Sequence, residues 1–105
     1  MAWILLISAG VLEIIWASAM KLSHGFSRPL PTTVMAVTLI ASFALLAAAM
    51  RTLPLGTDYT VWTGIGAVGA FVVGIAFMGE SVSAARIVAA LLILAGIVLM
   101  KLTSQ

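Results

Sequence analysis

Four long apolar segments alternate with short polar stretches along the whole chain. The first segment is about 19 residues long, which as a helix gives roughly 28 Å and matches the ~30 Å hydrocarbon core of a bilayer. The polar stretches between the segments are too short to form a separate domain. The pattern predicts an all-α membrane protein, a single transmembrane domain over residues 1–105, with helices at about 2–20, 31–50, 58–78 and 84–102.

The first two connections contain residues that commonly end or begin helices. His24 lies in a stretch rich in Gly, Ser and Pro, and is expected to be a solvated loop residue. In the second connection Pro54 and Gly56 interrupt the apolar pattern. Either Thr57 or Asp58 is then placed to cap the third helix.

The third connection, residues 79–83, is predicted to be a tight hairpin. Gly79 is suited to end one helix, and Ser83 is suited to cap the next. Glu80 would then lie at the water interface. It is expected to be a solvated acid near Arg86 rather than part of a functional site.

The composition excludes several classes of protein. The chain is 64% hydrophobic and only 8% charged, whereas a soluble domain is typically about 25% charged. It has no cysteine and a single histidine, so neither a thiol nucleophile nor a metal site is expected. No motif indicates an enzyme, a cofactor or a nucleic-acid partner. The first segment lacks the basic start and the cleavage signal of a signal peptide, so it is expected to be a retained helix.

One carboxylate, Glu13, lies in the middle of the first apolar segment. An ionised side chain at the centre of a membrane helix costs about 2.5 to 3.5 kcal/mol, so such a residue is a functional-site hypothesis by default. The alternative is a protonated carboxyl that hydrogen-bonds to a neighbouring helix and stabilises packing. Burial favours the neutral acid and a bound cation favours the carboxylate, so protons and a cation would compete for Glu13.

Several side chains are placed to surround this acid. Gly10 and Trp16 share its helical face by the i, i+3 spacing. Ser42 is the deeper of two polar residues in the second segment, although its hydroxyl could instead bond to a carbonyl of its own helix. Tyr59 and Trp62 share a face of the third segment, where the alternative for Tyr59 is an aromatic belt at the membrane surface.

The third segment also contains closely spaced small residues. Gly64 and Gly66 make this part a candidate hinge, and Gly66 continues the face of Trp62. Small side chains also allow another helix to approach closely. The fourth segment carries a stripe of small residues with little polar content, which favours packing between helices, including helices of two subunits.

Basic residues in the connections fix membrane orientation only weakly. Lys21, Arg28 and Arg86 fall on one predicted side, and Arg51 and Lys101 fall on the other. Because an excess of Lys and Arg normally marks the cytoplasmic side, this near balance predicts insertion in both orientations. Transporters commonly contain inverted repeats, which this chain lacks, and an antiparallel pair of copies would supply that symmetry.

Several motifs together resemble the small multidrug resistance family of proton-coupled exporters. They cover most of the chain: Glu13 in the first segment, Lys21-x-Ser23-x-Gly25-Phe26, Leu53-Pro54-x-Gly56-Thr57-x-Tyr59, Trp62-Thr63-Gly64-Ile65-Gly66 and the Gly79-Glu80 pair. Trp16, the Trp-Thr-Gly-Ile-Gly-Ala run and Lys101 resemble the guanidinium-exporter branch more than the quaternary-ammonium branch.

The resemblance implies an antiparallel dual-topology homodimer that spans the bacterial inner membrane and exports guanidinium or small guanidinyl cations in exchange for protons. One acid from each copy would form the shared site. The residues carried over are Glu13, Ser42, Tyr59 and Trp62, with Trp16 and Gly10 around them. Asp58 and Thr60 depart from the branch pattern, in which small apolar residues are usual, so Thr60 is a candidate selectivity residue.

Three other functions stay open from the sequence. One is export of quaternary ammonium or other hydrophobic cations, since Trp16, Tyr59 and Trp62 offer aromatic faces to any weakly hydrated cation. Another is a proton-conducting subunit of a larger ring, although such chains usually have two helices. The last is a small structural membrane protein without transport activity.

Overall fold

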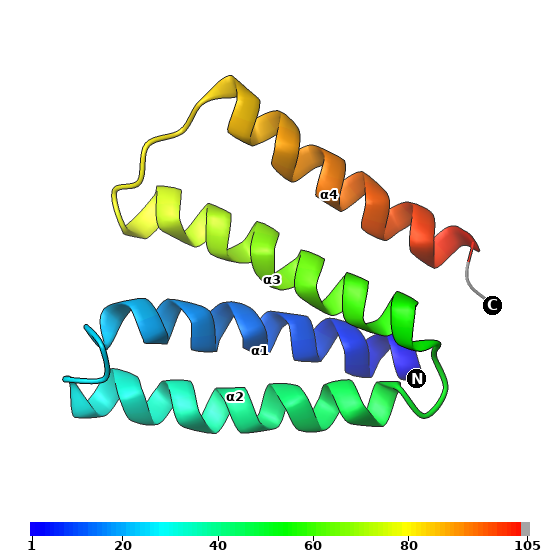
Figure 1. Ribbon diagram of the computed structural model, residues 1–105, viewed down its shortest axis with the longest axis horizontal. Helices are drawn as coiled ribbons and strands as arrows, with labels where there is room; N and C mark the ends of the chain where they lie inside the picture. Colours follow the sequence, from blue (N-terminus) through cyan, green and yellow to red (C-terminus); the bar gives the residue numbers. More distant parts are fainter. Residues whose placement is uncertain (104–105) are drawn as a thin grey trace.

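The computed structural model describes residues 1–103, and this part of the chain folds into four α-helices (Figure 1). They are α1 (Ala2–Leu22), α2 (Pro29–Ala49), α3 (Leu55–Phe77) and α4 (Ala84–Thr103). Each is long and apolar enough to cross a membrane. The predicted all-helical class and the four spans are therefore confirmed.

The helix α1 lies between α2 and α3, and α4 packs on the outer side of α3 (Figure 1). The helices α3 and α4 diverge toward the connection that joins them, so α4 leans away from the other three (Figure 1). Near its end α4 is tied to α1 by Lys101, whose Nζ lies 5.3 Å from the centre of the Trp3 ring. None of the α4 residues that the structure describes is buried.

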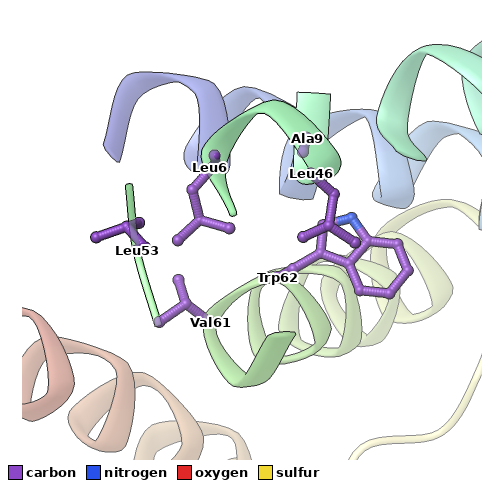
Figure 2. Packing of buried hydrophobic residues seen from close by; sticks show 7 residues of the cluster. Leu6, Ala9, Leu46, Leu53, Val61 and Trp62 are labelled. Carbon is purple, nitrogen blue, oxygen red and sulfur yellow. The ribbon is translucent and has the colours of Figure 1, made fainter. Parts of the chain in front are cut away.

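A small core joins α1, α2 and α3 at the end where α3 begins (Figure 2). Because lipid is as apolar as these side chains, their close fit stabilises the fold mainly through van der Waals contact. The buried hydrophobic residues of this core are Leu6, Ala9, Leu46, Ala49, Leu53, Val61 and Trp62.

Two helices begin at or next to proline. α2 begins at Pro29, two residues before the predicted start, because proline is suited to a first helical turn, where backbone N–H groups have no partner within the helix. α3 begins at Leu55 rather than at Asp58. Pro54 is its N-cap residue, with no side-chain cap hydrogen bond, so the predicted cap at Thr57 or Asp58 is wrong.

The connection between α3 and α4 confirms two predictions and corrects one. Gly79 has φ +70° just after α3, a conformation that favours glycine. The Ser83 Oγ accepts a hydrogen bond from the Arg86 backbone N–H at 3.3 Å and so caps α4. The connection is open rather than a tight hairpin, because the two helices separate at this end (Figure 1). Glu80 is exposed and lines a cavity with Lys21, and its predicted proximity to Arg86 stays a prediction.

Candidate functional site

Glu13 lies on α1 with its carboxyl against the backbone of α3. The side chain is half-buried, and a Cβ added at Gly66 would overlap its carboxyl group. Only glycine therefore allows α3 to pass this close to the acid. The contact between Glu13 and Gly66 comes from packing between α1 and α3, and the sequence did not predict it.

The glycines of α3 face both of its neighbours. Gly66 meets Glu13, and Gly69 meets the side chain of Ile14, also on α1. Gly64 faces the other way, where an added Cβ would lie 2.8 Å from the Ile97 Cδ1 of α4. α3 is helical without interruption through all three glycines. Their role in this conformation is close packing, and the predicted hinge at Gly64 and Gly66 stays a prediction.

Ser42 links all three packed helices through its hydroxyl group. The side chain is fully buried, and Oγ donates a hydrogen bond to the Ala9 carbonyl oxygen on α1 at 2.7 Å. The same oxygen accepts a hydrogen bond from Trp62 Nε1 on α3 at 3.0 Å. Ser42 therefore bonds neither to its own helix nor to Glu13, and instead fixes the Trp62 indole one helical turn from Gly66.

Four aromatic rings form a row beside these groups. The centre of the Trp16 ring lies 6.5 Å from that of Phe43, with the planes nearly parallel. Phe43 in turn lies 5.2 Å from Trp62, and Trp62 lies 5.7 Å from Tyr59. The predicted Trp16, Tyr59 and Trp62 thus belong to one row across α1, α2 and α3.

Phe43 joins that row but was not selected from the sequence. It is the sole aromatic residue in the segment 31–50 and directly follows Ser42, which is the signal that could have identified it. Its ring lies between Trp16 and Trp62, so α2 contributes a wall to the site as well as a hydroxyl group.

Two buried polar atoms near this row have no hydrogen-bond partner within residues 1–103: Glu13 Oε1 and Trp16 Nε1. A buried polar group without a partner typically costs about 1 to 3 kcal/mol, and more when it is charged. Such groups therefore need an explanation, and a role in binding a ligand is one. A carboxylate accepts paired N–H donors from a planar cation, and aromatic faces attract the same cation.

Three other predicted residues take different positions. Gly10 is buried, but it faces Ile65 of α3, where an added Cβ would lie 2.7 Å from Cγ2. The Tyr59 ring lies against Trp62 at a tilt of 39°, but Tyr59 is 53% exposed. Thr60 and Tyr59 both line a groove of about 440 Å³ between α3 and α4. Thr60 therefore lies away from Glu13 in this single chain.

Among residues 1–103, the site holds no cluster of residues that could form a metal site. Within the described part of the chain, no three His, Cys, Asp or Glu residues come together as a metal site would require. The chemistry available at Glu13 is exchange of a proton or binding of a cation by the carboxyl group.

The sequence matches the family model described as Small Multidrug Resistance protein over residues 1–94. It is 58% identical over 104 residues to the guanidinium exporter of Yersinia pseudotuberculosis serotype I (strain IP32953), covering 99% of this chain and 100% of that protein. It is 52% identical over 105 residues to the guanidinium exporter of Citrobacter freundii, covering 100% of both chains. With these full-length similarities and four membrane-spanning helices, the chain belongs to the small multidrug resistance family.

Proposed function

We propose that the chain exports guanidinium and small guanidinyl cations across the bacterial inner membrane in exchange for protons, as an antiparallel dual-topology homodimer. Membership of the family makes it a multi-pass membrane transporter rather than an enzyme. The substrate follows from relatives named guanidinium exporter that match along their full length. The observation that carries the mechanism is the buried Oε1 of Glu13 without a partner beside a row of aromatic rings.

Competition for one carboxyl group produces the exchange. A proton neutralises Glu13 and so removes the charge that attracts the cation, whereas guanidinium binds only the carboxylate. Guanidinium is planar and offers paired N–H donors, which match the two oxygens of a carboxylate. The proton-loaded and cation-loaded forms are expected to switch their opening from one side of the membrane to the other, whereas the empty, charged form does not. Movement of protons in one direction is then coupled to movement of the cation in the opposite direction.

The arrangement of α4 supports a second copy of the chain. α4 packs mainly on α3, and large apolar side chains along it are exposed, including Leu91, Leu92 and Val98. Three basic residues lie at one end of the helices and two lie at the other end. This near balance supports insertion in both orientations. An antiparallel pair would bring two Glu13 carboxyls to a shared site and supply the inverted symmetry that one chain lacks.

The aromatic row also favours a second candidate, export of hydrophobic quaternary ammonium ions, since such cations bind to aromatic faces. Purified protein in proteoliposomes under an imposed pH gradient distinguishes the two. Guanidinium, alkylguanidiniums and bulky aromatic ammonium ions would be compared at equal concentration. We expect guanidinium to be transported best. If aromatic ammonium ions are carried well and guanidinium is ignored, the proposed substrate is wrong although the family stands.

A further inference from the structure

A cavity of about 310 Å³ lies beside α3 at the end of the fold where α1 and α3 begin and α4 ends (Figure 1). Neither Glu13 nor the aromatic row lines it. Within residues 1–103, its lining is apolar except for one charged side chain. The walls come from three helices and include Trp3 and Ile7 of α1, Ile65 of α3, and Ile97 and Lys101 of α4.

This cavity lies on the side of α3 away from Tyr59. The four helices form a single layer, because their Cα atoms extend only 16 Å along the shortest axis, little more than the diameter of about 10 to 12 Å of one helix. Ile65 lines the cavity, and Thr63 lines the groove beside Tyr59. These two residues lie about 200° apart around the helix. A molecule in the cavity would therefore leave the side of Tyr59 free for a cation and for a second copy.

The cavity opens to the bilayer rather than to water. Ile7 is exposed, and Ile65 and Ile97 are partly exposed, on helices that span the membrane. From Trp3 to Ile7, and from Lys101 to Ile97, four residues of helix correspond to about 6 Å. The cavity thus extends from the membrane face into the spanning part. Hydrocarbon chains fill such an apolar space, because unfilled space would lose dispersion contacts.

Lys101 supplies a positive charge at the mouth of this cavity. It lies in the last turn of α4, and the interaction that its ammonium group makes within residues 1–103 is with the Trp3 ring, 5.3 Å from Nζ to the ring centre. An ammonium group has three N–H donors, and a ring face has no oxygen to accept them, so they stay available to phosphate oxygens. Long basic side chains near the ends of membrane helices extend to the surface, where lipid headgroups lie.

The charge of the cavity favours an anionic headgroup over a zwitterionic one. Among the described residues, no acidic side chain lines it, so nothing there would attract the positive part of a zwitterionic headgroup. Basic pockets between membrane helices bind anionic headgroups. A lipid that places its phosphate at Lys101 can direct an acyl chain inward past Ile97 and Ile7, since the cavity runs in that direction.

We infer that this cavity binds one phospholipid with an anionic headgroup, with the phosphate at Lys101 and an acyl chain against Ile7, Ile65 and Ile97. The lipid touches both α1 and α4 and so strengthens the contact that Lys101 and Trp3 make between these helices. Because the site lies on the side of α3 away from Tyr59, it does not depend on which cation the protein transports.

Lipid competition measures the headgroup preference. Purified protein in detergent micelles would be mixed with equal amounts of phosphatidylglycerol and phosphatidylcholine that carry the same acyl chains, and native mass spectrometry would count each bound lipid. We expect about fivefold more phosphatidylglycerol per chain, the ratio that corresponds to about 1 kcal/mol from one basic residue. Lys101→Gln should remove the preference, and Lys101→Arg should keep it. Arg86→Gln, which removes a charge at the other end of α4 and outside this cavity, should leave the ratio unchanged.

A second pair of variants tests the acyl-chain part of the site. Ile7→Trp places a larger side chain in the cavity and should lower the amount of bound phosphatidylglycerol. Ile4→Trp makes the same change at an exposed residue of α1 outside the cavity and should not. Inorganic phosphate in excess should not displace the lipid, because phosphate lacks the acyl chain.

Four outcomes would overturn the lipid site. They are equal binding of the two lipids by the unmodified protein, an equal loss of preference in Lys101→Gln and Arg86→Gln, equal lipid binding by Ile7→Trp and Ile4→Trp, and displacement of the lipid by phosphate. The second would indicate attraction by overall charge, and the last would indicate an anion site without a place for a chain.

Discussion

Removing the Ser42 hydroxyl should destabilise the protein, because this single group joins α1, α2 and α3. Ser42→Ala removes the 2.7 Å bond to the Ala9 carbonyl and the 3.0 Å bond from Trp62 Nε1. A hydrogen bond between membrane helices is worth about 0.6 kcal/mol on average and up to about 1.7. The two bonds together predict a loss of roughly 1 to 3 kcal/mol in the free energy of unfolding.

A double-mutant cycle isolates the contact between Ser42 and Trp62. Reversible unfolding in mixed detergent micelles, followed by circular dichroism, gives the free energy of unfolding for Ser42→Ala, Trp62→Phe and the double variant. The expected coupling energy is about 0.6 to 1.7 kcal/mol. Thr38→Ala is the matched control, since the Thr38 hydroxyl is on α2 but donates to the Val34 carbonyl of the same helix at 2.7 Å.

Strictly additive effects of the Ser42 and Trp62 substitutions would refute this account of the contact. So would a loss in Thr38→Ala as large as that in Ser42→Ala, because the effect would then come from placing any alanine in α2. Guanidinium transport gives an independent check. With the indole no longer fixed beside Gly66, we expect weaker guanidinium binding in Ser42→Ala even where the variant is fully folded.

Three further sets of variants test the proposed transport cycle. Glu13→Gln keeps the size of the side chain but removes the titrating charge, so it should abolish guanidinium binding and proton-driven uptake, whereas Glu80→Gln should be far milder; unchanged uptake in Glu13→Gln would contradict the mechanism. Adding or removing one or two Lys or Arg residues in the connections should force a single orientation and lower transport, which should return when oppositely biased chains are co-expressed. Full activity of either biased chain alone would contradict the antiparallel dimer. Trp16→Gly should lower guanidinium transport and admit larger hydrophobic cations, with Thr60→Ala shifting the preference less, as measured with both substrate classes; equal profiles for all three proteins would exclude Trp16 as the residue that limits size.

The helices were predictable because hydropathy and segment length are properties of single chain segments. The start of α3 was not, since Pro54 and Gly56 were interpreted as helix-breaking, whereas Pro54 is the N-cap residue and Gly56 lies within the first helical turn. The cap of α4 was predicted correctly because Ser83 directly precedes an apolar run and bonds locally. The end of a helix was therefore predictable from the local sequence wherever a residue suited only one structural role, as Ser83 did.

The site was predictable where a residue type is rare in its surroundings. Glu13, Trp16 and Trp62 stand out in apolar segments, and their spacing placed them toward a shared site. The partner of Ser42 could not be identified, because its acceptor is the backbone carbonyl of Ala9 and every residue has a carbonyl. Phe43 was missed for a related reason, since phenylalanine in a membrane helix usually faces lipid or core.

The positions of the α3 glycines give a route by which movement of α4 reaches Glu13. Gly64 and Gly66 are two residues apart and so point to nearly opposite sides of the helix, one toward Ile97 of α4 and the other toward the Glu13 carboxyl. No side chain separates the α3 backbone from either neighbour at these positions. α4 has little other support in one chain, so in the proposed dimer its position is set by the second copy. In the proposed dimer, a shift of α4 would therefore press directly on α3 and change the space around Glu13, which would couple dimer geometry to the proposed binding of cations and protons.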